Sequence, residues 1–383
     1  MRPDSVSSRI AIAVILLPLL TTLWSRYSAL HAGETDAAKR WLESRRTARA
    51  LRLITVALWW ALWDLQPPPG RTPLFGVLLF WIPPILSIGS AHIIACVTSS
   101  TILKYRWTST DILRLALWAT VSPTIALLFI ATGFEFIYEK RWLGILWILI
   151  AGIAALVGEL RFRAAEGLTL RKVKSGQAYT RAFQLAKKMG VKLERVYVVP
   201  AGKGHLTNAY GSARSIAVTD NYGEFLRGSQ LDYLIGHELG HAKQRHGNRK
   251  LLIVALLFLV PAFVLLILPS SLLPSRPIVD LALMLGLTLA SYSVSRRFEY
   301  EADRESVELT GDPRTAVYAL ANLCRVTGTP VTCGRLIELF LTHPSFRRRA
   351  EAIARVGKMD LNGIDEILQH AGLLDTTLPE MRC

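Results

Sequence analysis

The sequence predicts a mostly α-helical, polytopic membrane protein, with about seven transmembrane helices and a cytoplasmic α+β part that carries a small sheet. Half of the 383 residues (51%) are hydrophobic and only 19% are charged, which is more apolar than is usual for a soluble domain. Several apolar runs are long enough to cross a bilayer, and one stretch between them has the pattern of strands and amphipathic helices. The composition excludes a disordered chain, and four cysteines are too few for a disulfide scaffold.

Seven apolar segments are candidates for transmembrane helices, since a bilayer core of about 30 Å requires roughly 20 mostly apolar residues. They are residues 10–24, 51–65, 74–97, 112–133, 142–158, 251–273 and 278–294. The first has the basic start of a signal peptide but no small-x-small cleavage site before Arg26, so we expect an uncleaved anchor. The second is short and contains Asp64, which leaves six spans as an alternative.

Basic residues crowd the predicted loop between the first two segments, where Lys and Arg are frequent from position 26 to position 52. Positive charge stays on the cytoplasmic side, so we expect the N-terminus outside a bacterial plasma membrane, and residues 161–250 and 296–383 on its cytoplasmic side. The same rule explains the net charge of +16 without nucleic acid, because basic residues of the soluble part show no aromatic interleaving. The 26–52 loop is expected to attract anionic lipid headgroups of the bilayer.

The chain therefore divides into four predicted parts. They are a transmembrane region of about five helices at 1–160, a cytoplasmic segment at 161–250, two transmembrane helices at 251–295, and a cytoplasmic helical segment at 296–383. The pattern within the first cytoplasmic segment predicts helices at 175–189 and 231–246 and strands at 195–199 and 213–219.

The helix predicted at 231–246 contains the sequence His237-Glu238-Leu239-Gly240-His241. Histidines at i and i+4 lie on one helix face, so both imidazoles can bind one Zn²⁺. Zinc lowers the pKa of a bound water to about 7, and the Glu238 carboxylate can take its proton during attack on a carbonyl. Gly240 is small and allows close approach of a neighbour. The alternative for this motif is a surface helix with two solvated histidines.

A catalytic zinc needs a third protein ligand, and the best candidates follow the seventh apolar segment. Glu299 and Asp303 are again at i and i+4, so one can bind the metal while the other fixes a histidine ring. The alternative is a charged helix stem whose acids pair with neighbouring arginines. If the helices continue into the membrane, His241 and Glu299 lie about 15 Å and 8 Å from its cytoplasmic face.

The order of these motifs resembles the type I CAAX prenyl endopeptidase and HtpX family of membrane zinc metallopeptidases. The resemblance covers roughly residues 165–357. It includes Asn208-Ala209-Tyr210-Gly211 with the following 216–219 strand, and His343-Pro344 with Arg349. Five predicted spans before the histidine motif and two after it resemble the CAAX branch, whereas HtpX-type proteins have fewer spans before the motif.

The resemblance implies a zincin-like domain that holds one Zn²⁺ per chain on His237, His241 and Glu299, with Glu238 as general base. It also implies that Asp303 orients a ligand histidine, that His343 stabilises the oxyanion and that Arg349 supports the site. An extended polypeptide would then add as a strand beside residues 216–219. The residues expected to bind this substrate are Asn208, Ala209, Ile216, Ala217 and Val218. His246, five residues after His241, is expected to be a surface residue at the helix end.

We therefore predict a membrane-embedded zinc metalloendopeptidase that hydrolyses peptide bonds of membrane-associated or misfolded proteins. One alternative is CAAX-type processing of the C-termini of lipidated peptides. Another is a signal transducer with a metallopeptidase-like domain, although the predicted outer loops are too short for a sensor. A transporter with a vestigial site is a third alternative, and it would carry charge inside its spans, where Asp64 is the one clear acid.

Overall fold

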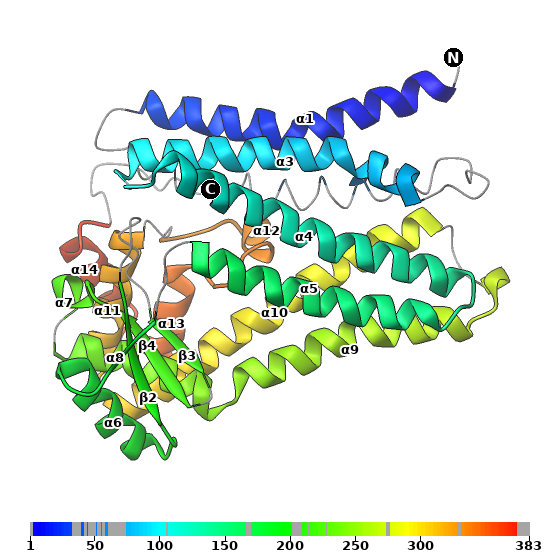
Figure 1. Cartoon of the computed structure of the whole chain (residues 1–383). Helices are drawn as coiled ribbons and strands as arrows, with labels where there is room; N and C mark the ends of the chain where they lie inside the picture. Colours follow the sequence, from blue (N-terminus) through cyan, green and yellow to red (C-terminus); the bar gives the residue numbers. More distant parts are fainter. Residues whose placement is uncertain are drawn as a thin grey trace. The chain divides into compact units, whose positions relative to one another are not determined.

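The computed structural model describes residues 3–32, 74–104, 106–165, 170–200, 209–212, 214–226, 228–272, 276–327 and 331–373, with residues 40, 41, 44, 51, 55, 58 and 59. The described part is mostly helical and contains a small sheet (Figure 1). It forms two compact units. The first is Met1–Glu166 with Val254–Thr288, and the second is Gly167–Ile253 with Leu289–Cys383.

The first unit consists of apolar helices. Its described helices are α1 (Pro3–Leu30), α3 (Leu74–Ile102), α4 (Ser109–Tyr138) and α5 (Leu143–Ala165), with parts of α9 (His246–Ile267) and α10 (Arg276–Thr310). Among the described residues, four segments are long and apolar enough to cross a membrane: Ile12–Leu30, Ile85–Ile102, Ser109–Tyr138 and His246–Ile267. Leu143–Gly158 is a shorter apolar helix.

These segments coincide with five of the seven predicted ones. The predicted segment 278–294 forms the first half of α10, and the predicted segment 51–65 lies mostly outside the described residues. α3 continues without a break through Pro83 and Pro84. A membrane helix tolerates proline because its neighbours and local adjustments satisfy the freed carbonyl. The total of seven spans stays a prediction.

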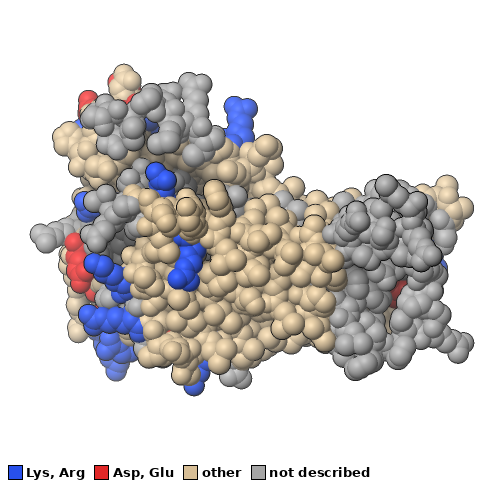
Figure 2. All heavy atoms as spheres, turned by 90° about the horizontal axis from the view of Figure 1, so that it is seen from above, with Lys and Arg blue, Asp and Glu red and all other residues tan. Residues whose placement is uncertain are grey.

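Helices of this unit approach one another through small residues and expose apolar ones. A Cβ atom added to Gly133 of α4 would lie 2.8 Å from the carbonyl oxygen of Gly144 in α5, so the two backbones are in contact. On α1, Leu16, Leu20 and Trp24 are exposed. In Figure 2 the described surface over α1 is uncharged across a broad area, and Lys and Arg side chains gather toward one side. Such a surface is suited to contact with lipid.

The second unit is an α+β domain. Its strands are β1 (Arg171–Val173), β2 (Arg195–Val199), β3 (Ala209–Ser212) and β4 (Ser215–Thr219). Its helices, besides the ends of α9 and α10, are α6 (Gln177–Met189), α7 (Tyr222–Phe225), α8 (Ser229–Lys243), α11 (Pro313–Thr327), α12 (Arg335–Leu339), α13 (Phe346–Val356) and α14 (Asn362–His370). The sheet has the order β1-β2-β4-β3, in which β2 and β4 are parallel and the other pairs antiparallel.

β4 is an interior strand, and this position corrects one prediction. Ile216 pairs with Val196 of β2 on one side and with Gly211 of β3 on the other. The strand is buried from Ile216 to Thr219, as expected for a run of apolar residues inside a sheet. Because both sides of β4 are paired, a substrate strand cannot add beside residues 216–219. The edge strand of the described sheet on this side is β3.

α8 lies in the core of this unit and packs closely on α10. Ile235 and Leu239 are fully buried within the main apolar cluster. A Cβ atom added to Gly240 would lie 3.1 Å from the Cα of Ala302, and one added to Gly236 would lie 2.6 Å from the Ser306 hydroxyl. The two glycines therefore set the short distance between α8 and α10, as the sequence suggested for Gly240.

The predicted helix 231–246 is shorter in the structure and is followed by a bend. α8 ends at Lys243, and α9 begins at His246. Between them Arg245 has φ of 51°, in the left-handed region that ends a right-handed helix. The chain therefore changes direction before it enters α9, so His241 and His246 are not on one continuous helix.

Candidate metal centre

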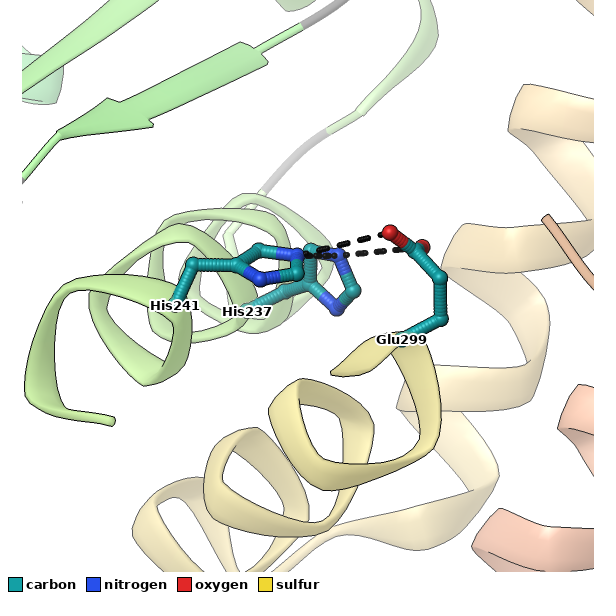
Figure 3. A group of neighbouring side chains, drawn as sticks. All are labelled: His237, His241 and Glu299. Carbon is teal, nitrogen blue, oxygen red and sulfur yellow. Dashed lines mark hydrogen bonds and ion pairs between the residues drawn. The ribbon is translucent and has the colours of Figure 1, made fainter. Parts of the chain in front are cut away.

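The two histidines of the motif and Glu299 converge on one point (Figure 3). His237 and His241 project from the same face of α8, and Glu299 reaches them from α10. Their ligand atoms all lie within 4.8 Å of one another. His237 and Glu299 are buried, and His241 is partly exposed. Of the described residues, this is the group of histidines, cysteines and acids that meets the geometry of a metal site.

The distances within this group fit a tetrahedral metal ion. The Nε2 atoms of His237 and His241 are 3.2 Å apart, and they lie 3.6 and 3.5 Å from the Glu299 carboxylate oxygens. Ligands about 2.1 Å from a tetrahedral zinc would be separated by roughly 3.4 Å. Burial alone would raise the pKa of the Glu299 carboxyl, but His343, His241 and Arg349 hold it well below its usual range. The carboxylate is therefore anionic, as a metal ligand must be.

Asp303 holds the ring of His237 from the side opposite the ligand atom. Its carboxylate lies 2.9 Å from His237 Nδ1 and accepts a hydrogen bond of 2.7 Å from the Tyr233 hydroxyl. Arg349 donates to it through Nε and Nη2, at 2.8 and 2.7 Å. Although burial by itself would raise the pKa of Asp303, Arg349 and the hydrogen bond to His237 hold it well below its usual range. The charged carboxylate thus fixes His237 with Nε2 toward Glu299.

His246 is not the surface residue that the sequence suggested. It is 3% exposed. Its Nδ1 lies 2.7 Å from Nδ1 of His241, and its Nε2 lies 3.1 Å from the Glu301 carboxylate. The prediction was wrong because it assumed a straight helix, on which positions five apart face different ways, whereas the bend at Arg245 returns His246 to His241.

Glu238 lies beside the edge strand of the sheet. It is buried, and a Cβ atom added to Gly211 of β3 would lie 2.9 Å from its Oε2 atom and 2.6 Å from its backbone oxygen. A glycine is therefore required at this position of β3 if the carboxylate is to keep its place. The general base of the predicted reaction and the edge strand are thus immediate neighbours.

His343 is the most exposed side chain of the group. Its Nδ1 lies 3.0 Å from Glu299 Oε2, and 64% of its side chain is accessible. The segment that carries it is anchored to α10 by Arg296, which donates to the carbonyl oxygens of Glu338, Leu339 and Leu341. The imidazole of His343 is thus paired with Glu299 and at the same time accessible to solvent.

The structure brings some of the predicted site residues together and leaves others apart. His237, His241, Glu299, Asp303, Arg349 and His343 are brought together. Glu238 follows His237 in α8 and lies beside Gly211 of β3. Asn208 lies outside the described residues. Ala209 is on the edge strand, whereas Ile216, Ala217 and Val218 are buried in β4 and cannot pair with an added strand. Tyr233 was missed, although its spacing of four residues before His237 places it on the same helix face.

Comparison with known proteins identifies the domain that contains this centre. Residues 174–356 match the family model of peptidase family M48. These residues belong to that family. The M48 match includes every residue of the centre described above, from Gly211 of β3 to Arg349 of α13. The family relationship that the motifs suggested is confirmed.

Curated relatives and a solved structure agree with this assignment. A protease HtpX homolog of Polynucleobacter necessarius is 26% identical over 224 residues, which are 49% of this chain and 74% of the relative. A protease HtpX homolog of Pseudarthrobacter chlorophenolicus is 22% identical over 275 residues, which are 56% of this chain and 93% of the relative. The crystal structure of Ste24p of S. mikatae matches 92% of this chain and 99% of its own, with a TM-score of 0.54 and 15% identity.

These findings confirm the predicted class of protein. The chain is a membrane metallopeptidase with a mostly helical fold like that of Ste24p. The curated relatives cover about half of the chain, and the fold match extends over nearly all of it. The alternative of a signal transducer is not favoured, because the relatives are proteases.

Proposed function

We propose that the chain is a zinc-dependent endopeptidase in which His237, His241 and Glu299 hold the metal. The convergence of these three ligand atoms within 4.8 Å is the observation that supports the proposal most strongly. Bound there, zinc would polarise a scissile carbonyl and acidify a water. The three ligands leave a fourth position for that chemistry, as in catalytic rather than structural zinc sites.

In this proposal the protons are moved by residues of the chain. The Glu238 carboxylate takes a proton from the attacking water and then gives it to the nitrogen of the leaving amine, as the carbonyl carbon gains oxygen and loses nitrogen. His343, exposed beside Glu299, donates through its ring to the developing oxyanion. Asp303 and Arg349 hold His237 in place.

The substrate would add as a strand to β3 rather than to β4. β3 is the edge strand, and Gly211 is in contact with Glu238. A peptide paired antiparallel to residues 209–212 would therefore run past the general base, with its backbone fixed by hydrogen bonds rather than by its side chains. This mode of binding is suited to unfolded polypeptides of many sequences.

Membrane-associated or misfolded proteins are the substrates that this arrangement favours. The basic loop at 26–52 supports a cytoplasmic active site and contact with anionic headgroups. The HtpX relatives support a bacterial plasma membrane. Reporter fusions at the two ends of that loop, in inside-out vesicles, test the orientation. Vesicle binding that is unchanged when anionic lipid is omitted would contradict the lipid contact.

Metal analysis and proteolysis of the purified chain test the function. We expect wild-type protein to carry one zinc and to cleave an unfolded casein probe. Glu238→Gln is expected to retain zinc and to lose at least about 100-fold in kcat. Glu224→Gln, at an exposed position of α7, is the matched control and is expected to behave as wild type. Equal cleavage by Glu238→Gln and wild type would end the proposed role of Glu238.

A further inference from the structure

Each ligand histidine of the metal centre uses one ring nitrogen for the metal site and turns the other to a partner. His237 presents Nε2 to Glu299 and Nδ1 to Asp303. His241 also presents Nε2 to Glu299, but its Nδ1 meets the Nδ1 atom of His246 at 2.7 Å. The second ligand therefore has a partner that no motif of the sequence assigned to it.

The ring of His246 is held by Phe298 and by Glu301. Its ring is stacked on Phe298 with centroids 4.2 Å apart and planes inclined by 5°. Its Nε2 lies 3.1 Å from the Glu301 carboxylate. The ring of His246 therefore has a partner at each of its two nitrogens. A neutral imidazole has one donor and one acceptor nitrogen.

Glu301 is held in turn by two arginines. Its carboxylate accepts from Arg297 at 3.0 Å and from Arg249 at 3.2 Å. The Arg249 guanidinium also lies over the ring of Phe298, 5.1 Å from its centroid. The carboxylate is thereby kept charged, and both of its oxygens have partners.

The hydrogen positions follow from this arrangement. His241 must keep the lone pair of Nε2 for the metal, so its proton is on Nδ1 and is donated to His246. His246 then accepts at Nδ1, and its own proton is on Nε2 and is donated to Glu301. One proton therefore lies in the contact between His241 and His246, and another in the contact between His246 and Glu301.

We propose that His246 and Glu301 are positioning residues that orient His241 and fix its tautomer, as Asp303 does for His237. The inference rests on the proposed metal site. It gives the two ligand histidines equivalent supports from α10, one through Asp303 and the other through Glu301 and an intervening imidazole. His246 touches neither substrate nor metal, and it acts only through His241.

Zinc affinity, measured by competition with a chromophoric chelator, tests the inference. His246→Phe keeps a ring on Phe298 but removes both nitrogens, and we expect it to weaken zinc binding by about 10–100-fold. His246→Asn places an amide oxygen where Nδ1 stood, so it should recover part of this loss. The visible spectrum of the Co²⁺-substituted protein should change in the Phe variant and shift back toward wild type in the Asn variant.

Matched controls separate positioning from folding. His370→Phe replaces an exposed histidine of α14, and we expect no change in zinc affinity or in the Co²⁺ spectrum. If His246→Phe does not fold, zinc binding by Glu301→Gln tests the inference instead. Glu308→Gln, on the same helix, is the control for this variant. Glu301→Gln is expected to weaken zinc binding by about tenfold.

The outcomes distinguish this inference from the proposed function. If wild type neither binds zinc nor cleaves the probe, the proposed function is wrong. If wild type does both, and a folded His246→Phe binds zinc as tightly with an unchanged Co²⁺ spectrum, only the positioning role is overturned. If the Phe variant is unfolded, unchanged zinc affinity and an unchanged Co²⁺ spectrum in Glu301→Gln overturn the positioning role.

Discussion

Asp303 is 1% exposed and is the most completely buried acid of the centre. Its charge is matched by Arg349, with which it shares two hydrogen bonds. Loss of one partner of a buried ion pair leaves an uncompensated charge and costs about 3–5 kcal/mol. At the scale of the residue, stability and the orientation of His237 therefore depend on the same carboxylate.

Asp303→Asn is expected to lower the free energy of unfolding by about 3 kcal/mol and zinc affinity by about 10–100-fold. Chemical denaturation in detergent and chelator competition measure the two effects. Asp365→Asn, which breaks the partly exposed pair with Arg347, is the control and should cost at most about 1 kcal/mol. A stability loss no larger than that of the control would contradict the assigned role of Asp303.

Gly211→Ala is expected to reduce kcat by about 100-fold while zinc binding is retained. The added Cβ would lie 2.6 Å from the backbone oxygen of Glu238 and 2.9 Å from its Oε2 atom, so β3 and Glu238 would have to move apart. A shift of about 1 Å can cost that much in rate. Gly223→Ala, at a position of α7 with nothing within 4 Å, is the control. An active Gly211→Ala enzyme would show that Glu238 does not need its place beside β3.

At the scale of the element, the bend between α8 and α9 decides which side chains meet. Arg245 adopts φ of 51° although it is not a glycine, and its side chain is exposed. The left-handed conformation costs an ordinary residue roughly 1–2 kcal/mol. The strained turn at Arg245 is what places His246 beside His241.

Arg245→Gly is therefore expected to raise the free energy of unfolding by up to about 1 kcal/mol, after allowance for the freedom that glycine adds to the unfolded chain. Arg245→Val is expected to lower it, because a β-branched residue is least compatible with this conformation. Thermal unfolding in detergent measures both. The opposite order of the two variants would show that the bend is not strained.

Local spacing explains which parts of the centre could be predicted. His237, His241, Glu299 and Asp303 follow from positions four apart on helices, because that geometry is fixed by the helix itself. The contact of His246 could not be predicted, because no glycine marks the bend at Arg245. The strand order could not be predicted either, since pairing across the sheet depends on residues distant in sequence, and β4 was therefore mistaken for an edge.

At the scale of the whole molecule, the two units are interleaved in sequence. The second unit is built from Gly167–Ile253 and Leu289–Cys383, with residues of the first unit between them. The apolar content predicted a membrane region and a separate α+β part, because composition differs so strongly between them. The exact residues at which the chain passes from one unit to the other could not be predicted, because α9 and α10 continue across the boundaries between the units.

Removal of the metal is expected to abolish cleavage reversibly. A chelator should inhibit the enzyme, and zinc at about 1,000 times its Kd should stabilise the folded state by about 4 kcal/mol relative to the metal-free protein. Activity and thermal unfolding, with and without added zinc, measure both effects. A chain that stays fully active after complete loss of its metal would contradict the proposed chemistry.

Two of the proposed metal ligands, His241 and Glu299, are separated in sequence by α9 and the first half of α10. During synthesis, His237 and His241 are made before Glu299. The growing chain therefore has no complete centre until the intervening apolar hairpin has also been made. In the proposed mechanism, cleavage therefore cannot begin until both helices have been synthesised.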